Sequence, residues 1–569
     1  MRSPRVALLV VAAIAISGVG FPLVVSPPDA TVWPHLVLWV PFALVLRRTH
    51  GVRALLAGWA TGALVYAVGF RWLADSVERF TGMSPVVGWV VGAAFGVLWG
   101  FAYGVWGAGL GPVARATGRW WPVAGALWFA ACEHWNPQLF PWTQAAPWYL
   151  HSEVFLGISL GGPALLTFAI VLINLAVVAA VERATGRPEH VPGALERAVA
   201  TALVTVLVLI GWSHHRLAVL AEAEAQADPL RVALIQNNLE PGEFRALNKA
   251  DKSGVVQGLA DLSREALVAD PDVDVVIWAE AAILGRPDQK RNGPLRALVR
   301  DEDVEVWTGA SFRLPGERKP VPRRVGAFRV GTDGRVAGRY DKNVLLPFGE
   351  YMPLSDVFPI LDDIGGAREL QGGDEMTVFE DAPADFAFLI CYEATRGRLT
   401  REAARSGAEL LVNITYDGWF GDSECPHQHL MLAAAQAAAT GIPMVRAAGT
   451  GISAIVDARG VPIATTDVFE RTFLTGEVRP VARPSVYVAL GDWVAYLATI
   501  AAFVALAIGA TRRRESAAVR AAAVLLLVAP LAWAINPKVP WAELAAWGFA
   551  VLALVVCSVP RLRAILRVP

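Results

Sequence analysis

Cysteine is scarce in this sequence, with four residues in a chain of 569. Four scattered cysteines are too few for the disulfide framework that supports small secreted domains. Cys132 and Cys557 fall within apolar segments, where a small buried residue is the expected role. Cys391 and Cys425 share a more polar block. A disulfide between them in an oxidising compartment is therefore an alternative to a reactive thiol at Cys391.

The chain also lacks an excess of charge of either sign. It contains 50 Lys and Arg residues against 51 Asp and Glu residues, a formal net charge of −1. No basic stripe interleaved with aromatic residues is present, so nucleic-acid binding is not expected. Internal repeats are absent too, and the only low-complexity stretch is the Ala/Glu-rich segment at residues 221–227. The organisation of the chain must therefore come from its hydropathy.

Apolar residues are what the sequence has in excess. They make up 55% of the chain, whereas about 45–50% is usual for soluble domains. A membrane-spanning helix needs about 20 such residues. The predicted spans are residues 6–25, 31–47, 53–72, 85–111, 121–140, 154–181, 198–214, 486–509, 518–535 and 541–559. The first could be a cleaved signal peptide, but its apolar run is long and no clear cleavage site follows, so a retained anchor is expected.

Arginine residues cluster at alternate ends of these predicted spans. The clusters are Arg2 and Arg5; Arg47, Arg48 and Arg53; Arg115 and Arg119; Arg183, Arg187 and Arg197; Arg512, Arg513 and Arg514; and Arg561, Arg563 and Arg567. Such clusters mark the cytoplasmic side of a membrane. Seven spans before the polar block and three after it place every cluster on one side. We therefore expect the block to face the periplasm or the cell exterior.

The polar block alternates strand-like and helix-like patterns. Strands are predicted at residues 231–236, 273–279, 304–307, 386–390 and 409–413 and near 444–456, and helices at 250–269 and 294–301 with a long Ala-rich helix after residue 413. Gly331-Thr332-Asp333-Gly334 is a strong hairpin signal. This alternation is typical of an α/β layered domain. The predicted domains are a membrane domain at 1–228, an α/β domain at 229–482 and a second membrane segment at 483–569.

Three chemically reactive side chains stand at the ends of predicted strands. Glu280 closes the run at 273–279, Lys342 follows a strand-like stretch, and Cys391 follows the run at 386–390. Because the residues after Cys391 are predicted to be helical, we expect an open thiol whose thiolate is favoured by a helix N-terminus. Glu280 would act as general base, and Lys342, with the backbone N–H of Tyr392, would stabilise a tetrahedral oxyanion. The set predicts covalent acyl transfer.

Several motifs around these residues match a known family. They are Tyr340-Asp341-Lys342-Asn343-Val344-Leu345-Leu346-Pro347-Phe348-Gly349-Glu350-Tyr351-Met352-Pro353, Cys391-Tyr392-Glu393, Asp417-Gly418-Trp419-Phe420-Gly421, Gln428-His429-Leu430, Arg446, and Thr450-Gly451-Ile452-Ser453. The chain resembles the nitrilase, or carbon–nitrogen hydrolase, superfamily. With its membrane segments, it looks like the apolipoprotein N-acyltransferase family within it. The resemblance implies an αββα sandwich that carries a Glu-Lys-Cys triad.

The resemblance also implies substrates and supporting residues. A phospholipid would give an acyl chain to Cys391, and the amine of a diacylglyceryl-cysteine lipoprotein would accept it, at the cytoplasmic membrane of a bacterium. Glu350 and Glu393 match supporting carboxylates that orient Lys342 or the amine. Trp419 and Phe420 would line the acyl-chain pocket, although packing in the domain core is an equal alternative. The chain is expected to act as a monomer.

The chain departs from the family pattern in several places. Ala279 and Ala281 stand where Pro and Ser or Thr are usual, and Tyr416 and Gly449 stand where Asn is usual. The helix around residues 436–442 lacks its usual Arg and Glu, and the family usually has one span after the domain instead of three. These departures concern the fit of the substrates more than the chemistry.

Three other interpretations remain open. His427 and His429 could hold a metal, but no third ligand lies nearby and a thiol mechanism needs none, so neither metal nor cofactor is expected. The chain could be a membrane-tethered amidase or acyltransferase with another acceptor. It could also be a non-catalytic scaffold or transporter, although its spans contain few of the paired charges that mark ion pathways.

Overall fold

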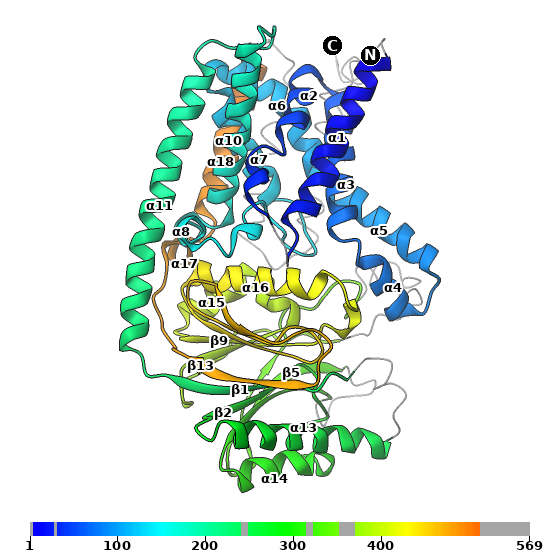
Figure 1. The fold of residues 1–569 in the computed structure, drawn as a ribbon, viewed down its shortest axis with the longest axis vertical. Helices are drawn as coiled ribbons and strands as arrows, with labels where there is room; N and C mark the ends of the chain where they lie inside the picture. Colours follow the sequence, from blue (N-terminus) through cyan, green and yellow to red (C-terminus); the bar gives the residue numbers. More distant parts are fainter. Residues whose placement is uncertain (1–3, 28–30, 240–248, 314–322, 352–369, 513–569) are drawn as a thin grey trace, which may run out of the picture.

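The computed structural model describes residues 4–27, 31–239, 249–313, 323–351 and 370–512. A bundle of helices forms one end of the molecule, and an α/β domain forms the other (Figure 1). The predicted spans at 518–535 and 541–559 lie outside the described residues, as do Cys557, Met352 and Pro353.

Five helical segments within the described ranges are long and apolar enough to cross a membrane. They are Leu8–Val25 within α1 (Pro4–Val25), α3 (Val52–Gly69), the stretch Pro85–His134, α10 (Pro163–Ala184) and α11 (Ala194–Gln226). The stretch Pro85–His134 contains α5 (Pro85–Trp99), α6 (Phe101–Thr117), the turn η2 (Gly118–Trp120) and α7 (Trp121–His134). A further apolar helix, α18 (Trp493–Arg512), returns from the α/β domain and packs in the bundle (Figure 1).

The remaining helices of this part are short. They are η1 (Trp33–Leu36), α2 (Val40–Arg48), α4 (Leu73–Thr81), η3 (Ala146–Trp148), α8 (Ser152–Phe155), α9 (Ile158–Gly161) and α17 (Val486–Leu490). The predicted span at 31–47 is therefore broken into η1 and a nine-residue α2. Pro34 and Pro41 explain the break, because each stands in the first turn of a new helix, where proline is tolerated.

Helix α11 is longer than its predicted span. Its 33 residues continue past residue 214 to Gln226 and lead directly into the α/β domain. The extension is rich in Ala, Leu and Glu, all of which favour a helix. Its glutamates make it too polar for a spanning segment. Hydropathy located the apolar part of this helix and missed its polar end.

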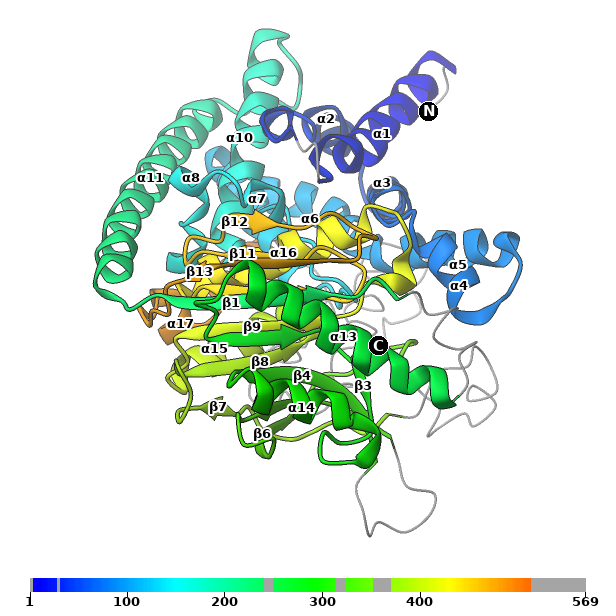
Figure 2. The same ribbon diagram turned by 60° about the horizontal axis from the view of Figure 1, so that its bottom comes forward.

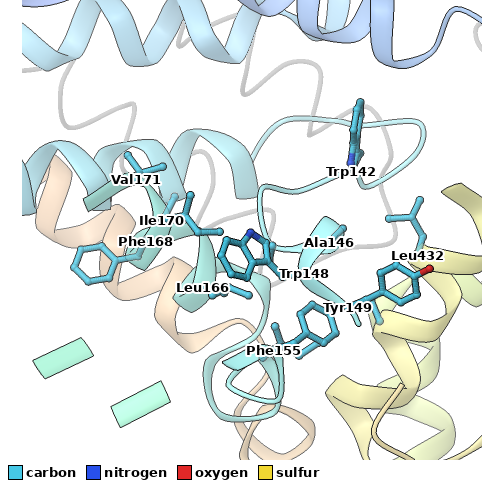
Figure 3. Packing of buried hydrophobic residues seen from close by; sticks show 14 of the residues in the cluster. Trp142, Ala146, Trp148, Tyr149, Phe155, Leu166, Phe168, Ile170, Val171 and Leu432 are labelled. Atoms are coloured by element: carbon cyan, nitrogen blue, oxygen red, sulfur yellow. The ribbon is translucent and has the colours of Figure 1, made fainter. Parts of the chain in front are cut away.

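Large apolar side chains cover the outside of the bundle. Those on α1, α5, α11 and α18 include Leu8, Leu9, Ile16, Val86, Trp89, Val90, Leu203, Val204, Leu207, Leu497, Ile500 and Val504, all exposed. Exposed apolar bands of this kind fit a lipid environment. The interior of the bundle is equally apolar and reaches the α/β domain. Figure 3 shows Leu432 of α16 (Cys425–Thr440) packed with Tyr149 and Phe155 of the bundle in one cluster.

The α/β domain contains two sheets. The first has the order β13-β1-β2-β4-β5-β6, with β3 paired to β4. Its strands are β1 (Leu230–Gln236), β2 (Val275–Trp278), β3 (Ile283–Leu284), β4 (Glu305–Phe312), β5 (Arg324–Val330), β6 (Val336–Asp341) and β13 (Thr472–Val478). The second has the order β12-β11-β10-β9-β8-β7. Its strands are β7 (Val378–Phe379), β8 (Phe386–Ile390), β9 (Leu410–Thr415), β10 (Met444–Ala448), β11 (Ala454–Val456) and β12 (Pro462–Thr465).

Helices cover the outer face of each sheet. α13 (Lys249–Ala269) and α14 (Gly293–Asp301) lie across the first sheet (Figure 2). α15 (Gly397–Arg405) and α16 lie between the second sheet and the bundle (Figure 1). The domain is therefore an αββα sandwich, as the sequence predicts.

Strand β8 shows why the apolar run before Cys391 has no polar alternation. Phe386, Phe388 and Ile390 point into the core between the sheets, while Ala387 and Leu389 point toward α16 and the bundle. A strand that is buried on both faces is expected to be continuously apolar. Cys391 follows at the end of this strand, and the next residue, Tyr392, contacts the Leu139 carbonyl of the bundle.

Candidate active site

The structure places Glu280, Lys342 and Cys391 side by side. Glu280 follows β2, Lys342 follows β6 directly, and Cys391 follows β8 directly, so both sheets contribute. Lys342 Nζ is 3.2 Å from Glu280 Oε1. A hydrogen bond with the Cys391 thiol is among the contacts of Glu280. A carboxylate, an ammonium and a thiol therefore share one small site.

Two carboxylates hold the Lys342 side chain in place. Its Nζ donates to Glu350 Oε1 at 2.6 Å as well as to Glu280, and Glu350 Oε2 accepts from the backbone N–H of Leu346 at 2.7 Å. Burial alone would lower the pKa of Lys342, but the two carboxylates outweigh it and raise the pKa well above its ordinary value. The ammonium stays charged, and with two of its three protons engaged it has one left for a ligand.

The state of the Cys391 thiol differs from the expectation. Its side chain is half-buried, and burial, followed by the charge of Glu280, raises its pKa well above 9.0, with Lys342 opposing the rise. The residues after it form a five-residue 3-10 turn, η6 (Cys391–Thr395), and α15 begins only at Gly397. The predicted helix N-terminus beside the thiol is therefore absent, and the resting group is a thiol that needs a base.

Glu280 has the properties that such a base requires. Burial raises its pKa above the ordinary value of 4.5, and the charge of Lys342 opposes this rise. A carboxylate whose pKa is raised toward neutrality is a better proton acceptor than an ordinary one.

The backbone of Cys391 adopts an unusual conformation. Its φ of 53° lies in the left-handed region that non-glycine residues rarely occupy. Two buried side chains hold its carbonyl oxygen: Asn413 Nδ2 at 3.4 Å and His429 Nε2 at 3.3 Å. Strained residues of this kind persist at functional sites when their surroundings fix them.

Asn413 and His429 belong to a larger buried network. His429 Nδ1 lies 2.9 Å from Asp417 Oδ1, and Arg446 donates to Asp417 Oδ2 at 2.7 Å and to Asn413 Oδ1 at 2.5 Å. Burial alone would raise the pKa of Asp417, but Arg446 and His429 lower it below its ordinary range. The sequence suggested only a metal site for His429 and predicted no role for Asn413, Asp417 or Arg446. The signal was present, because Asn413 and Arg446 are polar residues inside apolar strands and must be paired there.

Glu393 joins the segment that follows Lys342 to the segment that precedes Cys391. Its carboxylate accepts four hydrogen bonds, from Tyr340 Oη (3.0 Å), Asn343 N (2.7 Å), Val344 N (2.9 Å) and Ile390 N (2.8 Å). Burial raises its pKa to about 7, and the backbone donors oppose this rise. Glu393 thus fixes the backbone after Lys342 to the backbone before Cys391, whereas Glu350 contacts the Lys342 ammonium itself.

Tyr392 and Phe420 lie at the contact between the domain and the bundle. The Tyr392 hydroxyl donates to the carbonyl of Leu139, and its ring packs edge-on against Phe140. Phe420 is buried against Trp72, with ring centroids 5.1 Å apart. Trp419 is half-buried and meets the ring of Tyr416 edge-on. Phe420 therefore packs between the domain and the bundle.

Two departures from the family pattern compensate for each other. A Cβ at Gly449 would lie 2.6 Å from Cδ2 of Tyr416, so the missing side chain makes room for the tyrosine ring. The Tyr416 hydroxyl donates to the carbonyl of Leu239 at 2.6 Å. The pair is a local repacking that leaves Cys391 in its turn.

The remaining candidates have other contacts. Cys391 and Cys425 are both free thiols, so the alternative of a disulfide between them is wrong. His429 contacts Asp417 and the Cys391 carbonyl, as described above. In the described part of the chain, no three His, Cys, Asp or Glu side chains gather in a way that could hold a metal ion.

Comparisons with known proteins agree with the two-part architecture. Residues 231–484 match the carbon–nitrogen hydrolase family, and residues 17–176 match the apolipoprotein N-acyltransferase N-terminal domain. The chain is 33% identical over 355 residues to an apolipoprotein N-acyltransferase from Geobacter metallireducens, covering 61% of this chain and 66% of that relative. It is 32% identical over 388 residues to one from Methylococcus capsulatus, covering 66% of this chain and 71% of that relative.

Among solved structures, a similar one is an amidase from Nesterenkonia sp.. The sequence identity is 20%, the TM-score is 0.33, and the match covers 46% of this chain and 92% of the amidase. Another is a carbon–nitrogen hydrolase from Helicobacter pylori, with 15% identity and a TM-score of 0.35. That match covers 47% of this chain and 92% of the hydrolase.

Proposed function

The chain belongs to the apolipoprotein N-acyltransferase family, and from this premise we propose that it moves a phospholipid acyl chain, through a thioester on Cys391, to the N-terminal amine of diacylated lipoproteins. The observation that carries the proposal is the shared site of Glu280, Lys342 and Cys391, beside which Tyr392 contacts the Leu139 carbonyl of the bundle. The domain is a catalytic nitrilase-like domain, and the chain is an acyltransferase by its relatives.

In the first step, Glu280 takes the proton of the Cys391 thiol as the sulfur attacks an ester carbonyl of the phospholipid. The third proton of Lys342 and the backbone N–H of Tyr392 stabilise the oxyanion that forms, a contribution of about 3 kcal/mol for one such donor. The carbon–oxygen bond then breaks. The lysophospholipid leaves with the proton that Glu280 held, and the acyl chain remains as a thioester.

In the second step, the amine of the acceptor attacks the thioester carbonyl. Glu280 accepts a proton from the amine, an amide forms, and the Cys391 sulfur leaves and is protonated again. Glu350 holds Lys342 in both steps, while Glu393 keeps the segment after Lys342 bound to the segment before Cys391. Trp419 and Phe420 are proposed to contact acyl chains, an idea supported by the position of Phe420 beside Trp72.

The membrane arrangement follows from the same proposal. The chain associates with a bacterial membrane; we propose that it is a multi-pass protein of the cytoplasmic membrane. Residues 1–228 and 483–569 would be embedded, and residues 229–482 would face the periplasm or exterior. Both substrates then keep their chains in the bilayer, which avoids extraction at about 0.8 kcal/mol per CH₂. The protein would act as a monomer.

A two-stage labelling experiment tests this function. The purified protein is first incubated with phospholipid carrying labelled acyl chains and then receives a synthetic diacylated lipopeptide. We expect the label to reach the peptide amine as an amide, and an N-acetylated peptide should receive none. Release of free labelled fatty acid alone would favour an amidase-like hydrolase, and an absence of label on both protein and peptide would favour a non-catalytic scaffold.

A further inference from the structure

Arg396 lies between η6, the turn that begins with Cys391, and α15. Its backbone N–H donates to the carbonyl of Glu393 at 2.9 Å. Its guanidinium donates to the Tyr392 hydroxyl at 3.1 Å, with Cζ 5.2 Å from the centre of the Tyr392 ring. The same hydroxyl donates to the Leu139 carbonyl of the bundle. The half-buried Arg396 side chain is thus fixed where the catalytic turn meets the bundle.

Arg396 differs in its partners from Arg401 and Arg405 of the adjacent α15. Arg401 pairs with Asp492 at 3.0 Å, and Arg405 donates to the carbonyl of Val488 at 2.7 Å. For Arg396, no carboxylate of the described residues lies within ion-pair distance, and its only side-chain partner there is the neutral Tyr392. A guanidinium has five N–H donors in a planar fork that suits a phosphate. Most of these donors are left for a ligand.

The neighbours of Arg396 link it to the reacting groups. Its charge also acts on Tyr351, where it opposes the rise in pKa that burial causes. Tyr351 follows Glu350, the carboxylate that holds Lys342. Because Lys342 is engaged by two carboxylates, it is poorly suited to bind a phosphate as well. Arg396 is thus a half-buried cation beside Tyr392 whose charge no described carboxylate matches.

We propose that Arg396 binds the phosphodiester of the donor phospholipid and so determines that the donor carries a phosphate next to its glycerol. The inference rests on the proposed function. Of the two substrates, only the donor has an anion next to its glycerol. This phosphodiester is separated from the reacting ester by the glycerol backbone. The acceptor brings an amine, which is repelled by a guanidinium when protonated. Arg396 is a specificity residue for the first step and leaves the acceptor step unchanged.

The test compares two donors with the same acyl chains. Dioleoyl phosphatidylglycerol carries the phosphodiester, and dioleoylglycerol carries the same esters without it. Thioester formation on Cys391 is followed by mass in detergent micelles with Arg396→Gln, and Arg398→Gln is the matched control because Arg398 is exposed two residues away. We expect Arg396→Gln to slow acylation from phosphatidylglycerol by about ten- to a hundredfold, the effect of losing a charged hydrogen bond. Acylation from dioleoylglycerol should not change.

Three patterns of acylation rates would overturn the inference. An equal loss with both donors would assign Arg396 to holding Tyr392 in place, and no loss with either would exclude a role in donor binding. An equal loss in Arg398→Gln would indicate general attraction of lipid by surface charge. Inhibition of the wild-type protein by excess inorganic phosphate that disappears in Arg396→Gln would support the site, because it shows that the group recognised is the phosphate. If the wild-type protein forms no thioester with phosphatidylglycerol, the proposed function itself fails.

Discussion

At the scale of single residues, Lys342 has the most tightly defined surroundings in the site. It is 1% exposed, and its two partners, Glu280 and Glu350, differ in distance by several tenths of an ångström. The shorter contact, at 2.6 Å, is the one to Glu350. Glu350 is therefore the stronger anchor of the ammonium, and Glu280 is left free to exchange a proton.

Glu350→Gln should slow thioester formation on Cys391 by about ten- to a hundredfold, because a charged hydrogen bond to Lys342 is replaced by a neutral one. The measurement is single-turnover acylation by labelled phospholipid. Glu375→Gln, which removes an exposed carboxylate, is the control and should retain the wild-type rate. Equal rates in Glu350→Gln and the wild-type protein would show that Glu350 does not support the ammonium.

The pH dependence of acylation should report the pKa of Glu280. The base must be ionised to accept the thiol proton, and burial raises its pKa above 4.5. The rate of thioester formation should therefore fall as the pH is lowered, with a midpoint above 4.5, where an ordinary carboxyl group would still be ionised. Lys342→Met should move the midpoint upward, since it removes the charge that opposes the rise. A midpoint at or below 4.5 would contradict the role of Glu280.

At the scale of elements, the buried network behind Cys391 joins parts that are distant in sequence. Asn413 comes from β9, Asp417 precedes η7 (Gly418–Phe420), His429 is on α16 and Arg446 is on β10. All four are buried, and they meet the Cys391 carbonyl through Asn413 and His429. The network is the physical support for the strained backbone of Cys391.

Asp417→Asn should destabilise the α/β domain by about 3–5 kcal/mol, because it leaves the Arg446 charge buried without its partner. Thermal unfolding at neutral pH measures this, and Asp422→Asn, at an exposed position, is the control.

The lowered pKa of Asp417 also predicts how its contribution to stability changes with pH. Its contribution is present above its unfolded pKa of about 3.9 and is lost as the pH falls through its lower folded pKa. The stability difference from Asp417→Asn should therefore shrink in strong acid, and a constant difference would contradict the ion pair.

The local sequence pattern predicts the strands of the α/β domain better than it predicts the surroundings of Cys391. β8 was located by its continuous apolar run and the α/β class by the alternation of strands and helices, whereas the αββα order was implied by the family resemblance. The environment of Cys391 could not be read in this way. Its pKa depends on Glu280, more than a hundred positions earlier, and on burial by both sheets. The helix predicted after Cys391 is present as α15, but it begins only at Gly397, because Glu393 accepts the Ile390 N–H and closes a tighter turn first.

The membrane part was predicted less well for a related reason. Hydropathy marks apolar composition, so it identified α3, α10 and α11 but could not register the breaks at Pro34 and Pro41. It also could not indicate the polar contacts made inside the bundle. Asn174, for example, accepts from the Trp39 backbone N–H and donates to the carbonyl of His35. Such pairs join helices that are far apart in sequence.

At the scale of the whole molecule, the domain and the bundle form one packed body. The Trp72 indole donates to Gln428 Oε1 at 3.0 Å, and Gln428 Nε2 donates to the carbonyl of Gly69 at 2.8 Å. Arg71 also pairs with Glu424 at the start of α16. These contacts hold the catalytic face against the end of the bundle, so the orientation of one part in the membrane determines that of the other.

Site-directed labelling tests that orientation. Single cysteines at Val268 on α13 and at Ala184 at the end of α10, both exposed, are introduced after the native cysteines are replaced by Ala. A membrane-impermeant maleimide should label Val268→Cys in intact cells and Ala184→Cys only after the cytoplasmic membrane is opened. The reverse pattern would place the catalytic domain in the cytosol and exclude lipoproteins as acceptors.

The central claim is that Cys391 carries the acyl group between the two substrates. The direct measurement is the mass of the Cys391 peptide after incubation with phospholipid bearing labelled acyl chains and no acceptor. We expect one added acyl group on that peptide, removable by hydroxylamine as a thioester, and no addition in Cys391→Ala. A labelled peptide from elsewhere in the chain, or transfer to acceptor that persists in Cys391→Ala, would contradict the account.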